Sequence, residues 1–168
     1  MFLSKAEGPI GHNEVMLGFP QMKGTTPRSD LQILFRNDRQ FTLIQSKIRP
    51  TLPGLEIKEF TIAPMHGQSY YFLTSINSVF RQSRTGRQFS ILPEDWFKAR
   101  NFGAEFSIGL AIRKFKQEES KGRKIPLDQW TIGGTLLVTD SDRLSRAITD
   151  GIGRGKAWGC GLLSIAKI

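Results

Sequence analysis

The order of apolar segments in the second half of the chain limits its possible folds more than any other feature. Pro93-Glu94-Asp95 is typical of the first turn of a helix that ends near Asn101, and Asp140 is a suitable N-cap for a second helix over 141–149. Four further segments have the alternating or apolar composition of strands: 70–76, 106–115, 130–138 and 161–166. The resulting order of strand, helix, strand, strand, helix, strand is that of the ferredoxin-like fold.

The first half of the chain predicts a reduced copy of the same arrangement. It has one clear amphipathic helix, over 12–17, and four candidate strands: 2–6, 31–35, 41–45 and 57–62. Residues 64–68 are the candidate linker. We therefore expect an α+β protein with tandem ferredoxin-like (RRM-like) domains over 1–64 and 65–168, the N-terminal one being reduced.

The net charge of the chain is +9, and the charge is unevenly distributed. Residues 1–64 contain 8 Lys and Arg against 6 Asp and Glu, a balance of +2, whereas residues 65–168 contain 16 against 9, a balance of +7. Such a basic surface favours a polyanionic partner, and RNA, DNA and an anionic membrane surface are all compatible with it. A basic face that only maintains solubility is the alternative.

Histidine and cysteine are too scarce for most metal chemistry. Cys160 is the single cysteine, and His12 and His66 are the two histidines, so we expect no internal disulfide, no metal site and no cofactor. The first residues lack the pattern of a secretion signal. No apolar run approaches the roughly 18 residues that a membrane helix needs. These observations predict a cytoplasmic protein that does not enter a membrane.

The segment 151–161 combines glycines with two cations and an aromatic residue. Its glycines are Gly151, Gly153, Gly155, Gly159 and Gly161. Glycine permits positive φ and lets backbone N–H groups approach a phosphate, while Arg154 and Lys156 would supply charge. Trp158 could stack on a base or anchor the loop in the core. The segment is not a P-loop, because Ala157 follows Lys156 where a P-loop has Ser or Thr. A purely structural turn is the alternative.

Gly-Ile-Gly, five residues and then Gly-Cys-Gly-Leu-Leu-Ser-Ile, ending at Ile165, resembles the signature loop of the CRISPR repeat endoribonucleases, in particular the CasE subunit of the type I-E Cascade complex. A further similarity is His12 followed seven residues later by Phe19-Pro20. Other similar segments are 1–5, 134–140, 147–151, 71–77 and 87–93. Together these segments cover most of the chain.

The resemblance implies metal-independent cleavage of CRISPR precursor RNA at the 3′ base of the repeat stem-loop. The products would carry a 2′,3′-cyclic phosphate and a 5′-hydroxyl. The protein would then stay on the guide RNA hairpin, with other subunits of an effector complex as partners. His12 is the implied catalytic residue, because an imidazole can take the 2′-OH proton or protonate the leaving 5′ oxygen. His66 is expected to be a linker residue.

Several basic residues are candidates for contacting RNA. Arginines surround a turn at Gly86, so we expect a basic hairpin over 79–91 that grips the stem-loop. A charged loop is expected over 116–124. The RNA-binding candidates outside the glycine-rich segment are Lys5, Lys23, Arg81, Arg84, Arg87, Arg113 and Lys114. The aromatic residues expected in the core rather than on a stacking surface are Trp96, Phe97, Phe102, Phe106 and Trp130.

Two other functions stay open at this point. Members of the family usually carry a tyrosine one turn before the histidine, where this chain has Pro9. The first alternative is therefore a non-catalytic RNA-binding subunit that caps the 3′ hairpin of the guide RNA. The second is an unrelated ferredoxin-like nucleotide or metabolite binder. The sequence is compatible with a type I-E complex and with a related one, such as type IV.

Overall fold

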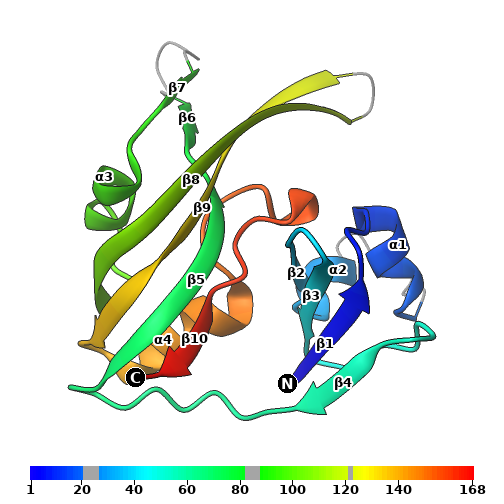
Figure 1. Ribbon diagram of the computed structural model, residues 1–168, viewed down its shortest axis with the longest axis horizontal. Coiled ribbons are helices and arrows are strands. Elements are labelled where there is room, and N and C mark those ends of the chain that lie inside the picture. The colour runs from blue at the N-terminus through cyan, green and yellow to red at the C-terminus, as the bar shows by residue number, and fades with distance from the viewer. Residues whose placement is uncertain (21–26, 82–87, 121–122) are drawn as a thin grey trace.

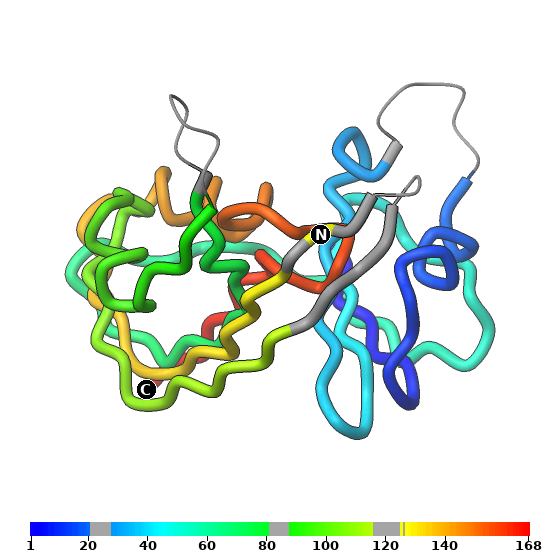
Figure 2. The backbone as a smooth tube through the Cα atoms, turned by 90° about the horizontal axis from the view of Figure 1, so that it is seen from above, coloured from blue at the N-terminus to red at the C-terminus, as the bar shows by residue number. Residues whose placement is uncertain are grey.

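The computed structural model describes residues 1–20, 27–81, 88–120 and 123–168, and it describes the backbone but not the side chain at 27, 81, 116–120, 123, 124 and 126. Two four-stranded antiparallel sheets form the framework. Figure 1 shows them side by side, and Figure 2 shows the same two units from above.

The first sheet has the strand order β2-β3-β1-β4. Its elements are β1 (Phe2–Glu7), α1 (His12–Leu17), α2 (Pro27–Asp30), β2 (Leu34–Asn37), β3 (Phe41–Ser46) and β4 (Glu56–Glu59). This is the ferredoxin-like order without the helix that would normally connect β3 to β4. On one face, Val15 of α1 packs with Phe35 of β2 and Ile44 of β3, because alternate strand residues point to the same side. The strand β2 forms one edge of the sheet.

The second sheet has the corresponding order β10-β5-β9-β8. Its elements are β5 (Ser69–Asn77), α3 (Pro93–Lys98), β8 (Ala104–Ser120), β9 (Arg123–Val138), α4 (Ser141–Asp150), η1 (Lys156–Trp158) and β10 (Ser164–Lys167). A two-stranded hairpin of β6 (Val79–Arg81) and β7 (Gln88–Ser90) is inserted before α3. Phe72, Ile132, Leu136 and Leu144 form the centre of the core between the sheet and its helices.

The two sheets confirm the predicted fold class and the order of strands. The expected domain boundary near residue 64 stays a prediction. The core position of the five aromatic residues is confirmed, since Trp96 and Phe97 are buried and the other three pack against them or their neighbours. None of the described helices is long and apolar enough to cross a membrane.

The sequence prediction was wrong in several details. The strand expected over 31–35 is β2, Leu34–Asn37, and the helix expected to end near Asn101 is α3, which ends at Lys98. Within the loop expected over 116–124, residues 116–120 and 123–124 are instead strand, because β8 runs to Ser120 and pairs with β9 from Arg123 onward. The last strand begins at Ser164 rather than at Gly161. Leu162 and Leu163, which precede β10, have buried side chains, but the pairing of β10 with β5 begins only at Ser164.

Polar contacts join the two sheets. The buried side chain of Gln45 on β3 donates from Nε2 to Ile148 O in α4, at 2.7 Å. Arg36 on β2 donates from Nη1 to Leu73 O and to Ser164 Oγ, both at 3.1 Å. By strand alternation Gln45 and Arg36 lie on the face of the first sheet that α1 does not cover. These contacts fix how the second unit lies against β2 and β3.

We expect Gln45→Ala to lower the free energy of unfolding by about 1–3 kcal/mol, because Ile148 O would be left buried without its donor. Urea denaturation followed by circular dichroism measures the change. Gln40→Ala, in the exposed turn before β3, is the control and should change stability by less than about 0.5 kcal/mol. Equal losses in the two variants would contradict a role for the Gln45 hydrogen bond.

Candidate functional site

His12 is the first residue of α1 and lies against the edge strand β2. Its ring is stacked on that of Phe35, with centroids 6.4 Å apart and 27° between the planes. The helix begins here because Gly11 is extended, with φ −81° and ψ 167°, and its N–H donates to Glu14 Oε2 at 2.6 Å. Val15 anchors the next turn in the core. The imidazole is therefore held at a fixed, half-buried position.

The surroundings of His12 favour its neutral form. Its Nδ1 is buried and has no hydrogen-bond partner among the described residues. Burial, and then the positive charge of Arg28, lower the pKa of His12 below its usual value of 6.5. A neutral imidazole that carries its proton on the buried Nδ1 has a free lone pair on Nε2. Nε2 is then the nitrogen that can accept a proton from a substrate at neutral pH.

Two cations from distant parts of the chain meet in one cavity, and one of them, Arg28, acts on the charge of His12. Arg28 of α2 donates a long hydrogen bond from Nη1 to Ile33 O, at 3.5 Å. Lys156 begins η1 and donates from Nζ to Asp150 O, at 2.5 Å. Arg28 and Lys156 line one cavity of about 130 Å³. The pKa of Lys156 is lowered first by burial and then by the charge of Arg28, while Asp150 acts in the opposite direction. Paired cations beside a neutral imidazole attract an anion.

The glycine-rich segment brings Lys156 to this place by packing on β2. Gly151 has φ +75°, and a Cβ there would lie 2.6 Å from Leu34 Cδ2, so a side chain would push the segment away from the strand. A Cβ at Gly159 would lie 3.4 Å from the ring of Phe35, the same ring that supports His12. In Figure 1 this segment, coloured orange to red, runs between the two sheets.

The remaining residues of the glycine-rich segment shape its turns and place its two cations against different cavities. Gly155 and Gly159 flank η1 in the left-handed conformation. Gly161 donates its N–H to Ser75 O at 2.7 Å, which ties the segment to β5. Trp158 is half-buried and lines a cavity of about 260 Å³ together with Arg154. Lys156 lines a different cavity from Arg154, although only one residue separates them.

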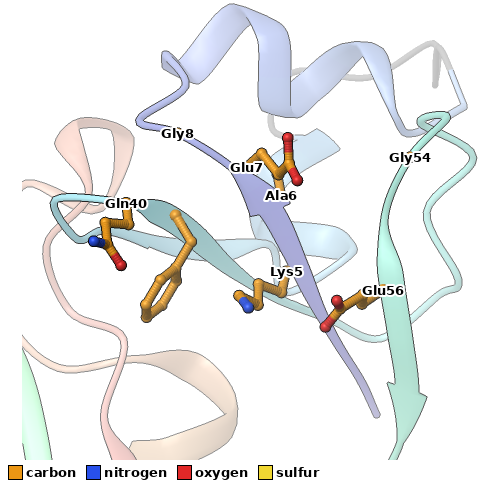
Figure 3. Close-up of a pocket in the computed structure, with 8 residues that line it drawn as sticks. Lys5, Ala6, Glu7, Gly8, Gln40, Gly54 and Glu56 are labelled. Carbon is orange, nitrogen blue, oxygen red and sulfur yellow. The ribbon is translucent and has the colours of Figure 1, made fainter.

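Lys5 is not brought to His12. It lies on the face of the first sheet opposite to α1, with Nζ 5.4 Å from the centre of the Phe41 ring. Figure 3 shows it in a cavity of about 440 Å³ that is also lined by Glu7 and Glu56. The two carboxylates give this cavity a mixed charge, which does not favour a polyanion.

The other basic candidates are distributed away from His12 or lie outside the description. Arg113 on β8 makes a bidentate ion pair with the buried carboxylate of Asp128, at 2.7 and 2.8 Å, and lies over the ring of Trp130. Lys114 follows it and is exposed. The candidates outside the described residues or side chains are Lys23, Arg81, Arg84 and Arg87. Arg81 ends β6, so the expected hairpin is formed at its base.

The described part of the chain contains no group of three or more His, Cys, Asp or Glu side chains that could hold a metal ion.

Arg28 is a residue of the candidate site that the sequence prediction missed. Its only sequence signal is its place after Pro27, at the beginning of a short helix.

Comparison with known proteins identifies the family. The family model described as "CRISPR associated protein" matches residues 4–167. The chain belongs to this family. A search of curated proteins finds no match.

Solved structures of CRISPR proteins have the same fold. Cse3 of Thermus thermophilus, bound to an RNA representing a pre-cleavage complex, is 21% identical with a TM-score of 0.70 and 98% of each chain covered. Cas6e of Escherichia coli K-12 is 18% identical with a TM-score of 0.73, and both chains are fully covered. A chain of a CRISPR RNA-guided surveillance complex is 20% identical with a TM-score of 0.78, again with full coverage.

We expect NMR titration of the His12 ring to give a midpoint below 6.5, because burial and Arg28 both disfavour the charged imidazole. Arg28→Ala should raise this midpoint, since it removes a repulsive charge. The exposed Arg39 in the turn between β2 and β3 provides the matched control, and Arg39→Ala should leave the midpoint unchanged. An identical His12 midpoint in the wild type and in Arg28→Ala would show that the two groups do not interact.

Proposed function

We propose that this chain is a metal-independent endoribonuclease that cleaves CRISPR precursor RNA at the 3′ base of the repeat stem-loop. It then remains on the guide RNA hairpin as a subunit of an effector complex. The observation that carries the proposal is the half-buried imidazole of His12 next to the charge of Arg28, which in turn shares a cavity with Lys156. The family and the fold shared with RNA-bound Cse3 support RNA as the substrate, and the surveillance-complex chain supports the assembly.

The site residues account for each part of the reaction. His12 Nε2 accepts the proton of the 2′-hydroxyl, and the 2′ oxygen attacks the adjacent phosphorus. The bond from phosphorus to the 5′ oxygen breaks, and the imidazolium of His12 returns the proton to that oxygen. The products are a 2′,3′-cyclic phosphate and a 5′-hydroxyl. Arg28 and Lys156 stabilise the negative charge that grows on the phosphate oxygens.

A non-catalytic RNA-binding subunit is the second candidate function. The position one turn before His12 is Pro9, and the chain has only two tyrosines. The hydroxyl of Tyr70 is engaged with Met65 N and Gln68 Oε1, both at 3.2 Å, within its own segment. Tyr71 is exposed on β5 of the second sheet. Neither tyrosine therefore assists His12, so the imidazole and the two cations would have to suffice.

We expect His12→Ala to slow single-turnover cleavage of the repeat RNA in EDTA by about 10²-fold or more while binding persists, because the proton acceptor is lost.

Lys156→Ala should slow cleavage by about 10²–10³-fold through the loss of charge stabilisation. A substrate with a 2′-deoxy sugar at the cleaved position should resist the wild type.

His66→Ala is the control, because His66 is exposed in the segment that connects the two sheets. It should cleave like the wild type. If His12→Ala and the wild type cleave equally fast, the proposed mechanism is wrong. If both bind the stem-loop tightly and neither cleaves it, the non-catalytic function is correct.

The pH dependence of cleavage has a defined direction. Because the neutral imidazole is the acceptor, the rate should rise with pH and level off above the lowered pKa of His12. Arg28→Ala raises that pKa and should move the rise to higher pH, besides lowering the plateau. Single-turnover rates measured between pH 4.5 and 8 test this, and a rise that does not move would contradict the assignment of His12 as the base.

A further inference from the structure

Arg100 is held rigidly by the residue that precedes it by one helical turn. It lies just after α3, and its guanidinium lies 4.2 Å from the centre of the Trp96 ring. Its Nη1 also donates to Trp96 O, at 2.7 Å. Trp96 itself is only 2% exposed. The guanidinium is therefore positioned before any ligand arrives, which reduces the entropy lost on binding.

Gly153 brings a second guanidinium to Arg100. Gly153 has φ +69°, and a Cβ there would lie 2.6 Å from Trp96 Cζ2. Only glycine lets the backbone pass so close to the tryptophan in this conformation. The next residue is Arg154, which is exposed, and its charge lowers the pKa of Arg100 in addition to the effect of burial. Trp96 thus holds Arg100 on its face, and the backbone that leads into Arg154 passes against its edge.

The two guanidiniums line a single open cavity of about 340 Å³. Asn77 and Phe80 contribute to its wall. Within the described residues, neither Arg100 nor Arg154 has a carboxylate at ion-pair distance. The arginines that do have one are Arg36, Arg113 and Arg143. Two adjacent cations without an acid repel each other, and a bound anion removes that cost.

We propose that Arg100 and Arg154 together bind one backbone phosphate of the RNA, at an anchoring point separate from the His12 site. This inference rests on the proposed function. The glycine-rich segment supports an RNA strand rather than an isolated anion, because Arg154 and Lys156 are two residues apart, which is at most about 7 Å of chain. A strand whose scissile phosphate lies at Lys156 therefore has other phosphates within reach of Arg154.

The test uses His12→Ala as the parent, so that RNA is bound but not cut. The dissociation constant of the repeat RNA is measured at several KCl concentrations for the parent and for three variants of it. These variants carry, in addition to His12→Ala, Arg100→Ala, Arg154→Ala or both. Each single change should weaken binding about tenfold. Because the remaining arginine still neutralises the phosphate, each single change should lower the slope of log K against log salt by less than the roughly 0.7–0.9 that the loss of one phosphate contact gives.

The double variant distinguishes a single phosphate held by both arginines from two phosphates held by one arginine each. If both arginines hold the same phosphate, only the double variant should lose the full slope of one phosphate contact, about 0.7–0.9, and the losses in affinity should not add. Lys58→Ala, an exposed charge on β4 of the other sheet, is the control and should leave the slope unchanged. Arg100→Lys keeps the charge and should retain the slope, and thermal melting verifies that Arg100→Ala remains folded.

The outcomes distinguish this inference from the proposed function. If the parent binds the repeat RNA and Arg154→Ala binds it with the same affinity and slope, the phosphate site is overturned while the nuclease proposal stands. The site is also overturned if each single variant loses the slope of one full phosphate contact and the double variant that of two, because the arginines would then hold different phosphates. If the parent does not bind the repeat RNA at all, both proposals fail.

Discussion

The packing of the glycine-rich segment against the edge strand β2 is the contact on which the candidate site depends. Gly151 lies against Leu34 and Gly159 against Phe35, so one side chain on each face of β2 is covered by the same segment. Phe35 also supports the ring of His12. A displacement of the segment would therefore separate Lys156 from Arg28 and remove part of the support beneath the imidazole. The edge of β2 is also protected from pairing with another chain.

The order of strands and helices was predictable because most elements have one buried face, and alternation of apolar residues reveals that face. The long ribbon of β8 and β9 was only partly predictable. Over 116–124 its sequence is charged on both faces, so no alternation marks the strands, and pairing with the neighbouring strand decides the conformation. At Leu162 and Leu163 the error was the reverse: a strand was predicted where the structure has a loop. Apolar residues that are buried in a loop resemble a strand in sequence.

The site was predictable only where a motif marked it. His12 and Lys156 belong to patterns that resemble a family, whereas Arg28 and Arg100 are single arginines without a surrounding motif. Arg28 meets Lys156 only through the packing of the two units, and Arg100 is placed by Trp96. Lys5 shows the converse limit. It is close to His12 in sequence, but alternation along β1 places it on the other face of the sheet. Proximity in sequence is thus a poor guide to proximity in space when one of the residues is on a strand, because alternate side chains point to opposite faces.

His12 and Lys156 also differ in when they are made. During synthesis, Lys156 leaves the ribosome after every described strand except β10. Until then the first sheet can fold with His12 and Arg28 already in place. The nascent chain would consequently hold the imidazole and one cation before the segment that completes the pair of cations is made.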